Sequence, residues 1–456
     1  MPPAHPRRRR AAAALAVLCA LALPALPQAA ASRAGTADAR ATFVYRITTA
    51  DPQDGERLLA HGFDLLEHRS GSDLFVLGDT ATRARLTALG FHPAVDRRLA
   101  DGAHRDRAAL ADGDTYDGGY RTVAAHYAHL DRVAAQHPDL AQVMTYGQSW
   151  RKQAGQGGND LRAICLTKQT GNDCRLDPHA PKPRFFLMSQ IHARELTTGE
   201  VSWRWIDYLT GGYGTDPAVT ALLDSTEVWV VPIANPDGVD IVAQGGDNPA
   251  YQRKNADDGN GSGCDAGGQI GVDLNRNAGS HWGASGTSDD PCSEVYLGPQ
   301  ADSEVENTAL EGLFRQLYPA VRGPGDGDPA PADTRGIMIT MHSDAGMVIF
   351  PWAHDHTVHT GNDAALRALA GRLGTMTGYQ SGQAGEILYD AAGGTDDWIY
   401  DKLGTAAFTI EAGDSDNRGC SGFMPPYSCQ DSYFWPKLRP ALLYAAQQAG
   451  APYTAG

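Results

Sequence analysis

The chain has 456 residues, of which 42% are hydrophobic and 20% are charged. This balance is normal for a globular protein, and the length provides ample material for a core. The formal net charge is −16 at pH 7. Because nucleic-acid binding needs a basic surface for the phosphates, this charge argues against a nucleic-acid partner.

The first 31 residues resemble a secretory signal peptide. Arg7–Arg10 form a basic start, and Ala11–Leu23 form an apolar segment. Ala29–Ala31 then provide the small residues of a cleavage site. The apolar segment is too short to span a bilayer, and no later run reaches the roughly 18 apolar residues that a membrane helix needs. We therefore expect residues 1–31 to be removed on export, giving a secreted, extracellular product with no membrane partner.

Residues 32–115 have an α/β pattern of their own, which ends in a polar linker. Two strands and two short helices are predicted, at 43–47, 74–79, 55–62 and 81–90. The stretch 97–116 is polar and charged, as is typical of an exposed processing site. We expect residues 32–115 to be a pro-segment with its linker, on which an activating protease acts. An accessory domain that stays in the mature protein is the alternative.

Residues 116–456 are predicted to form one large domain in which strands alternate with helices. Helices are expected at 121–137, 195–209 and 363–376, and strands at 184–189, 227–234 and 334–342. The NPDG segment at 235–238 is a strong turn signal. This alternation predicts a mixed, mostly parallel twisted sheet with helices on both faces, an α/β/α sandwich.

The remaining cysteines indicate disulfide bonds. Cys19 lies in the signal segment, and the other six form three pairs that are near in sequence. An even number, in loops rich in Gly and Asp, is expected of an oxidising compartment. By proximity, we expect Cys165 to pair with Cys174 and Cys420 with Cys429. A cysteine zinc site is the alternative, but the sequence contains no C-x-x-C motif.

Four polar residues follow apolar runs that read as strands. His192 and Glu195 lie in QIHARE, His342 in IMITMHSD and Glu411 in AAFTIEAGD. Because the carboxyl ends of parallel strands meet at one edge of a sheet, these side chains should converge. Two imidazoles and a carboxylate suit a catalytic zinc with an open position for water, and the spare carboxylate suits a base. A single His-x-x-Glu motif is weak evidence, since a lone histidine is more often structural; the strand-end context strengthens it.

Six segments resemble the zinc metallocarboxypeptidases of the pancreatic A/B type. They are HARE, NPDG, VDLNRN, MHSD, YDAAGGTDDW and FTIEAGD. They fall in the family's order and cover about residues 117–440, which is far more specific than any one segment. The resemblance implies that 116–456 is a catalytic domain with one zinc ion per chain. The leader and the pro-like segment also match the layout of secreted zymogens in that family.

The resemblance assigns the metal and catalytic residues. It implies that His192, Glu195 and His342 are zinc ligands and that Glu411 is the general base. A buried structural acid is the alternative for Glu411, but it would need a partner at an otherwise apolar strand end. Arg253 in YQRKN matches the arginine that stabilises the tetrahedral oxyanion; alone, it would read as a solvated loop residue.

The resemblance also assigns the substrate residues. Asn275 and Arg276 match the pair that binds the terminal carboxylate, and Tyr389 matches the tyrosine that closes over the terminal residue. Asp396 matches the floor of the terminal-residue pocket, where aspartate marks enzymes that prefer Lys or Arg. Ala384 leaves room for such a side chain. A solvated loop aspartate is the alternative for Asp396.

Other positions agree with the family or depart from it. The resemblance implies a disulfide between Cys264 and Cys292. The family's aromatic residue after NRN is replaced by Ala278, with Trp282 nearby, and the usual Ser-Tyr after His342 becomes Ser343-Asp344. The first change should alter packing under the carboxylate site, and the second should alter preference further along the peptide.

The sequence thus predicts a secreted, monomeric zinc carboxypeptidase. It should release C-terminal residues, with a preference for Lys or Arg, from peptides and proteins that have a free C-terminus. A zinc amidase acting on cell-wall peptides is one alternative, but such an enzyme should lack the Asn275/Arg276 pair. A non-catalytic binding module on the same fold is the other, but such a module typically loses a ligand or the base.

Overall fold

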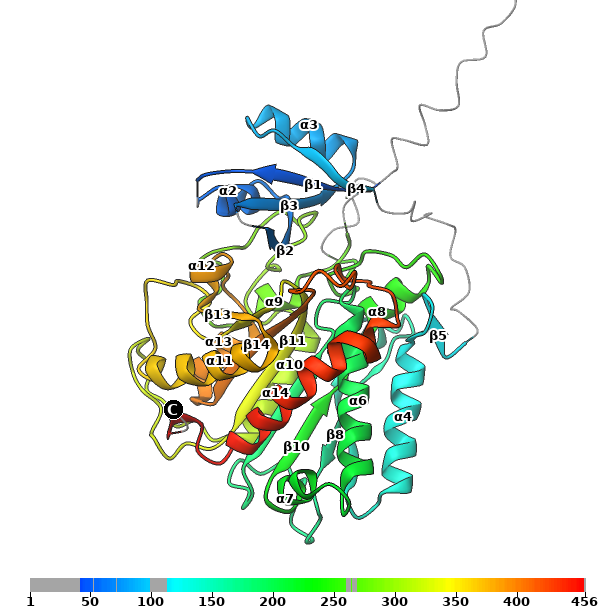
Figure 1. Cartoon of the computed structure of the whole chain (residues 1–456), viewed down its shortest axis with the longest axis vertical. Coiled ribbons are helices and arrows are strands. Elements are labelled where there is room, and N and C mark those ends of the chain that lie inside the picture. The colour runs from blue at the N-terminus through cyan, green and yellow to red at the C-terminus, as the bar shows by residue number, and fades with distance from the viewer. Residues whose placement is uncertain are drawn as a thin grey trace, which may run out of the picture.

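The computed structural model describes residues 42–98 (except 52 and 71), 113–259, 264 and 269–454. They form a small N-terminal α/β unit, residues 42–98, and a large α/β domain that begins at residue 113 (Figure 1). The predicted signal peptide lies outside the described residues, as do residues 99–112 of the predicted linker.

The N-terminal unit is a four-stranded antiparallel sheet, in the order β2-β3-β1-β4, with two helices. Its elements are β1 (Phe43–Thr48), α2 (Asp54–Ala60), β2 (Asp64–Ser70), β3 (Asp73–Gly78), α3 (Thr80–Ala88) and β4 (Ala94–Arg98). The two predicted strands and both predicted helices are confirmed. The sequence analysis missed β2 and β4, whose DLLEHRS and AVDRR lack the alternation of a half-buried strand.

The large domain is built on an eight-stranded sheet in the order β13-β12-β14-β11-β9-β10-β8-β7. Its strands are β7 (Ala141–Gln148), β8 (Asp160–Leu166), β9 (Arg184–Ser189), β10 (Glu227–Val231), β11 (Ile337–Asp344), β12 (Met347–Ile349), β13 (Gln380–Gly382) and β14 (Ala406–Gly413). The central strands β14, β11, β9 and β10 are parallel, and antiparallel pairs lie to either side. A separate two-stranded ribbon joins β5 (Thr115–Tyr116) to β6 (Tyr120–Arg121). The predicted mixed, mostly parallel sheet is confirmed.

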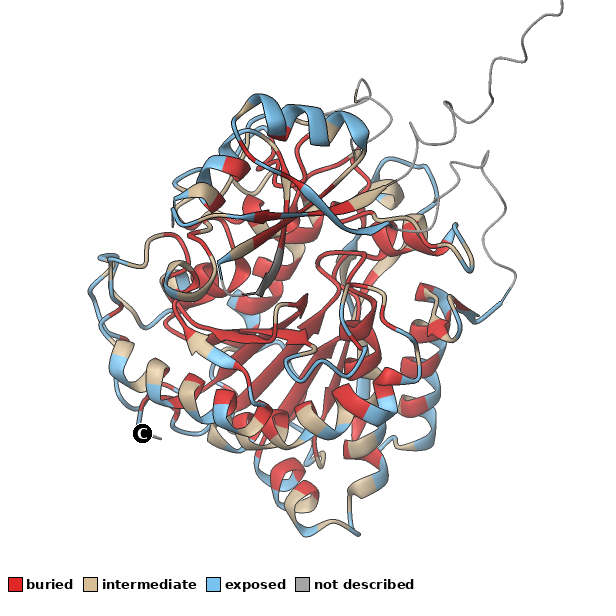
Figure 2. Ribbon diagram, turned by 45° about the horizontal axis from the view of Figure 1, so that its top comes forward, coloured by how far each residue is buried: buried red, intermediate tan, exposed pale blue. Residues whose placement is uncertain are grey.

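Helices cover both faces of this sheet (Figure 1). They are α4 (Val123–Gln136), α5 (Trp150–Gln153), α6 (Leu196–Gly212), α7 (Pro217–Ser225), α8 (Pro236–Ala243), α9 (Leu274–Asn277), α10 (Val305–Leu317), α11 (Asp363–Thr377), α12 (Ala384–Ile387), α13 (Thr395–Leu403) and α14 (Trp435–Gln448). A π-helical turn, Gln430–Phe434, precedes α14, and a 3₁₀ turn, Pro452–Thr454, follows it. All residues of β9, β11 and β14 are buried, as Figure 2 shows, which explains their continuous apolar sequences.

One local prediction is wrong. The NPDG segment is not a free turn, because Pro236 begins α8 and Asn235 caps it. The Asn235 side-chain oxygen accepts a hydrogen bond from the Gly238 N–H at 3.0 Å. Asn before Pro suits a helix start as well as a turn, and the residues after it decide between them. Strand β10 also ends at Val231, three residues before the predicted end at 234.

Three disulfides join the six cysteines of the described residues: Cys165 to Cys174, Cys264 to Cys292 and Cys420 to Cys429. All three predicted pairs are confirmed. No helix in the described part of the chain combines the length and the apolar character needed to cross a membrane.

Candidate metal centre and substrate cavity

The register of three neighbouring strands assembles the centre of the site. Strands β11 and β14 are parallel, and their register places His342 directly opposite Glu411. Strand β9 is the other neighbour of β11 and ends at Ser189. A short turn after β9 carries His192, and Glu195 lies at the start of α6. All four side chains are at least 96% buried, so the predicted convergence at the strand ends is observed.

His192, Glu195 and His342 turn their ligand atoms toward one another. His192 Nδ1 lies 2.7 Å from Glu195 Oε1 and 3.2 Å from His342 Nδ1, and His342 Nδ1 lies 3.3 Å from Glu195 Oε2. Ligand atoms about 2.0–2.1 Å from one tetrahedral ion are about 3.3 Å apart. The triad therefore has the spacing of three zinc ligands.

A fourth residue, Asp273, orients His192. Its Oδ1 accepts from His192 Nε2 at 3.1 Å and from the Asn275 N–H at 2.9 Å. With Nε2 held by this carboxylate, His192 presents Nδ1 to Glu195 and His342. A carboxylate on the outer nitrogen is the usual support of a metal-ligating histidine. The donor set of this site therefore fits zinc.

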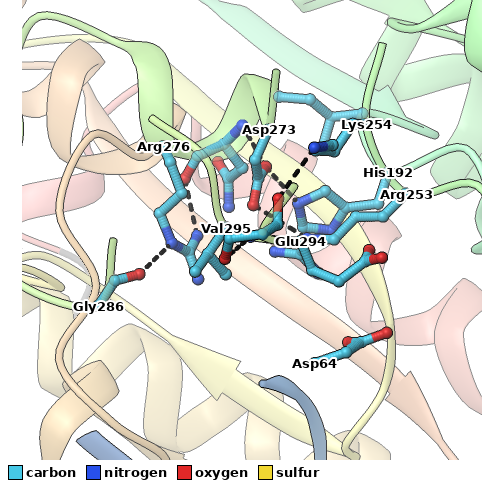
Figure 3. A network of polar contacts seen from close by, with 12 residues as sticks. Asp64, His192, Arg253, Lys254, Asp273, Arg276, Gly286, Glu294 and Val295 are labelled. Carbon is cyan, nitrogen blue, oxygen red and sulfur yellow. Dashed lines mark hydrogen bonds and ion pairs between the residues drawn. The ribbon is translucent and has the colours of Figure 1, made fainter. Parts of the chain in front are cut away.

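Asp273 also fixes Arg253. The second carboxylate oxygen of Asp273 accepts from Arg253 Nε at 2.9 Å (Figure 3). Burial alone would raise the pKa of Asp273, but the charge on Arg253 and the hydrogen bond from His192 hold it well below its usual range. Asp273 is thus an anion that binds the candidate metal ligand and the candidate oxyanion residue together.

One cavity of about 50 Å³ joins the predicted residues. Its lining includes His192, Arg253, Asn275, Arg276, His342, Tyr389, Asp396 and Glu411. Glu195 is not among the lining residues but contacts both histidines, at 2.7 and 3.3 Å. The structure therefore brings every predicted site residue to this centre, and the predicted small residue Ala384 lines the same cavity.

The Arg276 guanidinium is held in a fixed orientation by neutral oxygen atoms. Its Nε donates to the Gly286 carbonyl and its Nη1 to the Asn275 carbonyl, both at 2.8 Å, and its Nη2 lies 3.5 Å from the Tyr389 hydroxyl. Gly393, at φ +76°, lets the chain pass close behind it, since a Cβ there would lie 2.3 Å from the Arg276 carbonyl oxygen. This arrangement presents a positive fork to the cavity.

Asp396 lies in the first turn of α13 with 3% of its surface exposed. It accepts hydrogen bonds from Thr409 Oγ1 at 2.9 Å and from the Asp397 N–H at 3.0 Å. Burial and the nearby Asp397 charge raise its pKa. Asp396 is therefore a buried anion site that a cationic side chain in the cavity would stabilise, and the alternative of a solvated loop aspartate does not hold.

The N-terminal unit lies over the end of the large domain that carries α9 and α12 (Figure 1). Asp64 at the start of β2 accepts two hydrogen bonds from Arg194, at 2.8 and 3.0 Å. Arg194 is fully buried and lies between His192 and Glu195 in the chain. Tyr389 packs into an apolar cluster of the unit that includes Tyr45 and Phe63.

Sequence reasoning missed two residues of this centre. Asp273 was inside the quoted VDLNRN segment, and the need of a ligating histidine for a carboxylate partner could have indicated it. Arg194 was inside HARE, but its partner Asp64 lies 130 residues away on a strand that was not predicted. No local pattern could have indicated that pair.

Comparison with known proteins agrees with the geometry. A family model described as zinc carboxypeptidase matches residues 126–433. Carboxypeptidase A2 of Rattus norvegicus is 29% identical over 318 residues, covering 67% of this chain and 65% of that relative. Carboxypeptidase B of Homo sapiens is 30% identical over 343 residues, covering 73% of this chain and 72% of the relative. The crystal structure of carboxypeptidase A from Helicoverpa armigera is similar with a TM-score of 0.69 at 20% identity, covering 92% of this chain and 99% of that one.

The family match extends over most of the chain, so this protein belongs to the zinc carboxypeptidase family. The predicted resemblance and the zinc cofactor are thereby confirmed, and the His-Glu-His triad is the candidate site for the metal. The likeness to the insect structure confirms the fold. The chain spans about 65% of the length of the carboxypeptidase A2 relatives that it matches.

We expect Asp273→Asn to weaken zinc binding by about 10- to 100-fold, because it removes the charge that orients and polarises His192. Chelator competition measures the zinc dissociation constant. Asp333→Asn, at an exposed position, is the control and should leave it unchanged. An unaltered zinc affinity in Asp273→Asn would show that this carboxylate does not support the metal centre.

Proposed function

We propose that this chain is a secreted zinc-dependent carboxypeptidase that hydrolyses the C-terminal peptide bond and prefers Lys or Arg at the terminus. The observation that carries the proposal is the single cavity that combines the His-Glu-His triad, Glu411 and the Asn275/Arg276 pair. These groups supply a metal, a base and a carboxylate receptor, which together define an exopeptidase.

His192, Glu195 and His342 hold the zinc ion in this proposal. Zinc, when bound, acts as a Lewis acid and brings the pKa of a coordinated water toward about 7. The three side chains are buried and supported by Asp273, so the centre is preorganised. Loss of any one of them leaves only two of the three proposed ligands.

Glu411 is the general base. It lines the cavity beside His342, where a carboxylate can take the proton of the attacking water and pass it to the leaving amine. Arg253 stabilises the negative charge that develops on the carbonyl oxygen. The Asp273 ion pair holds the Arg253 side chain in place, so no reorganisation is needed during the reaction.

Asn275 and Arg276 bind the terminal carboxylate of the substrate. The guanidinium fork forms paired hydrogen bonds with a carboxylate, which specifies a free C-terminus. Tyr389, whose hydroxyl lies next to Arg276, closes over the terminal residue. Both the cell-wall amidase and the non-catalytic module are less well supported, because the carboxylate receptor and the base are both present in the cavity.

Asp396 sets the preference for Lys or Arg. The identities to carboxypeptidase A2 and to carboxypeptidase B do not indicate which terminal residue this chain prefers, since they are nearly equal at 29% and 30%. The buried Asp396 carboxylate supports this preference, because a cation in the cavity would stabilise it and the lining residues Ala353 and Ala384 are small. A long basic side chain fits this space and supplies the charge.

The N-terminal unit is a pro-segment that restricts the crevice. Its Asp64 carboxylate pairs with the buried Arg194 guanidinium, and its apolar core packs against Tyr389. Both contacts keep groups near the cavity from reaching substrate. Cleavage in the 97–116 linker by an activating protease releases the unit, and the signal peptide and three disulfides suit an extracellular, monomeric product.

We expect Glu411→Gln to lower kcat by about 10²-fold or more, because the amide keeps the shape but cannot accept the proton. Zinc content should stay at one ion per chain. Metal analysis and hydrolysis of a peptide ending in Arg check both expectations. Glu311→Gln, a buried carboxyl on α10 away from the cavity, is the matched control. Near-normal turnover of Glu411→Gln would make Glu411 a structural residue.

We expect Asp396→Ala to lower kcat/KM for C-terminal Arg by about 10²-fold, since a basic side chain loses its buried partner. Peptides ending in Leu or Phe should be cleaved as well as before, or better. A set of peptides that differ only in the last residue gives the comparison. Preference of the wild-type enzyme for Phe over Arg would rule out the basic specificity.

We expect the uncleaved chain to be poorly active and a cut in the 97–116 linker to raise kcat/KM. Asp64→Ala should raise the activity of the uncleaved chain, because Arg194 then loses the contact that fixes the unit. Asp51→Ala, on an exposed loop of the same unit, should have no effect. Equal activity before and after cleavage would make the unit an accessory domain.

A further inference from the structure

Two histidines outside the catalytic centre form a stacked pair behind the substrate cavity. The rings of His281 and His354 lie 3.5 Å apart with planes at 7°. Each ring has its own carboxylate: His281 Nε2 lies 3.0 Å from Asp326 Oδ1, and His354 Nδ1 lies 3.3 Å from Asp397 Oδ2. His281 belongs to the loop after NRN, where this chain departs from the family pattern.

The pair is not built to hold a metal, although His281, His354 and Asp397 offer ligand atoms within 4.8 Å of one another. Ring-nitrogen lone pairs lie in the ring planes. In two stacked, nearly parallel rings they run side by side and do not converge on an ion about 2.0–2.1 Å from both. A carboxylate beside each ring suits a protonated imidazole instead.

The pair connects to the substrate cavity on two sides. Asp397 accepts the backbone N–H groups of Ala353 at 2.8 Å and of His354 at 3.1 Å, and Ala353 lines the cavity. On the other side, Ser285 Oγ donates to the His354 carbonyl at 2.6 Å, and the next residue, Gly286, holds Arg276. The stack therefore joins the loop behind the carboxylate receptor to the helix that carries Asp396.

We propose that His354 is a positioning residue for recognition of a basic C-terminal side chain. As an imidazolium, it balances the Asp397 charge, so that the adjacent Asp396 remains an anion ready to bind Lys or Arg. The inference rests on the proposed preference for basic residues and adds a group that maintains it.

The charges around the stack favour a proton on His354. Burial lowers the pKa of His354, but the hydrogen bond and charge of Asp397, with Asp326 and Asp355, raise it above its usual value. His281 is contacted by Ser280 at Nδ1, and that serine also donates to Asp401. Arg322 lies over the Trp352 ring beside the stack, but it is paired with Asp401.

Loss of the charge on His354 should raise the pKa of Asp396. Burial raises the pKa of Asp396, and the charge on Asp397 raises it further. If the cation at position 354 is removed, the Asp397 charge acts on Asp396 without compensation. Asp396 then takes up a proton at a higher pH, and the acid limb of the pH profile for basic substrates moves upward. Substrates with an apolar terminal residue do not need the Asp396 charge, so their acid limb stays in place.

The test compares kcat/KM from pH 5 to 8.5 for two peptides that differ only in a terminal Arg or Leu. The enzyme is the zinc-loaded full chain, activated by limited proteolysis. Two variants are used: His354→Gln, which removes the charge and the stack, and His354→Phe, which removes the charge and keeps an aromatic ring. His179→Gln, an exposed histidine elsewhere on the surface, is the control.

Both His354 variants should move the acid limb for the Arg peptide upward by about one pH unit, which lowers kcat/KM near pH 6 by up to about tenfold. The Leu peptide should show no such shift, and its turnover reports that the variants are folded. A normal profile for His354→Phe would overturn the proposal, because packing alone would then explain the residue. A wild-type enzyme without Arg preference would instead refute the proposed specificity and the inference with it.

Discussion

The parallel pairing of β9, β11 and β14 is the constraint on which the site depends. The register of β11 and β14 places His342 opposite Glu411, and His192 follows the end of the neighbouring strand β9. Because side chains alternate across a strand, a slip of one residue would turn Glu411 to the other face of the sheet. Burial of these strands on both faces makes such a slip costly, so the hydrophobic core holds the candidate metal ligands and Glu411 in one geometry.

Buried charges then connect the parts of the site. Asp273 binds the candidate ligand His192 and the candidate oxyanion residue Arg253, and Figure 3 shows this network extending toward Asp64 of the N-terminal unit. Arg194 lies 3.5 Å from Glu294 as well as bonding to Asp64. Removing one member would leave its partner as an uncompensated buried charge, which destabilises strongly. The candidate metal centre, Arg253 and the N-terminal unit are therefore electrostatically coupled.

Much of this arrangement followed from the sequence, because its signals are local. Apolar runs marked the central strands, and polar residues at their ends marked His192, His342 and Glu411. The wrong or missing parts depend on tertiary contacts. Asn235 caps a helix because of residues beyond the NPDG segment, and β2 has too mixed a sequence to stand out alone.

Contacts between distant segments were also beyond local reasoning. The pairing of Asp64 with Arg194 and the stacking of His281 on His354 exist only once the chain has folded. The sequence analysis assigned no role to any of these four side chains. Asp273 was also missed, but it could have been predicted, because a metal-ligating histidine usually has a carboxylate partner.

The central claim is that a zinc centre and a carboxylate receptor act in one cavity on a free C-terminus. The most direct measurement follows two peptides of identical sequence by mass spectrometry, one with a free terminal carboxylate and one with a terminal amide, using the zinc-loaded, proteolytically activated chain. The account predicts that the free acid loses one residue at a time, that chelation stops this loss, and that the amide is cleaved far more slowly. Equal cleavage of both peptides, or cuts at internal bonds, would contradict it.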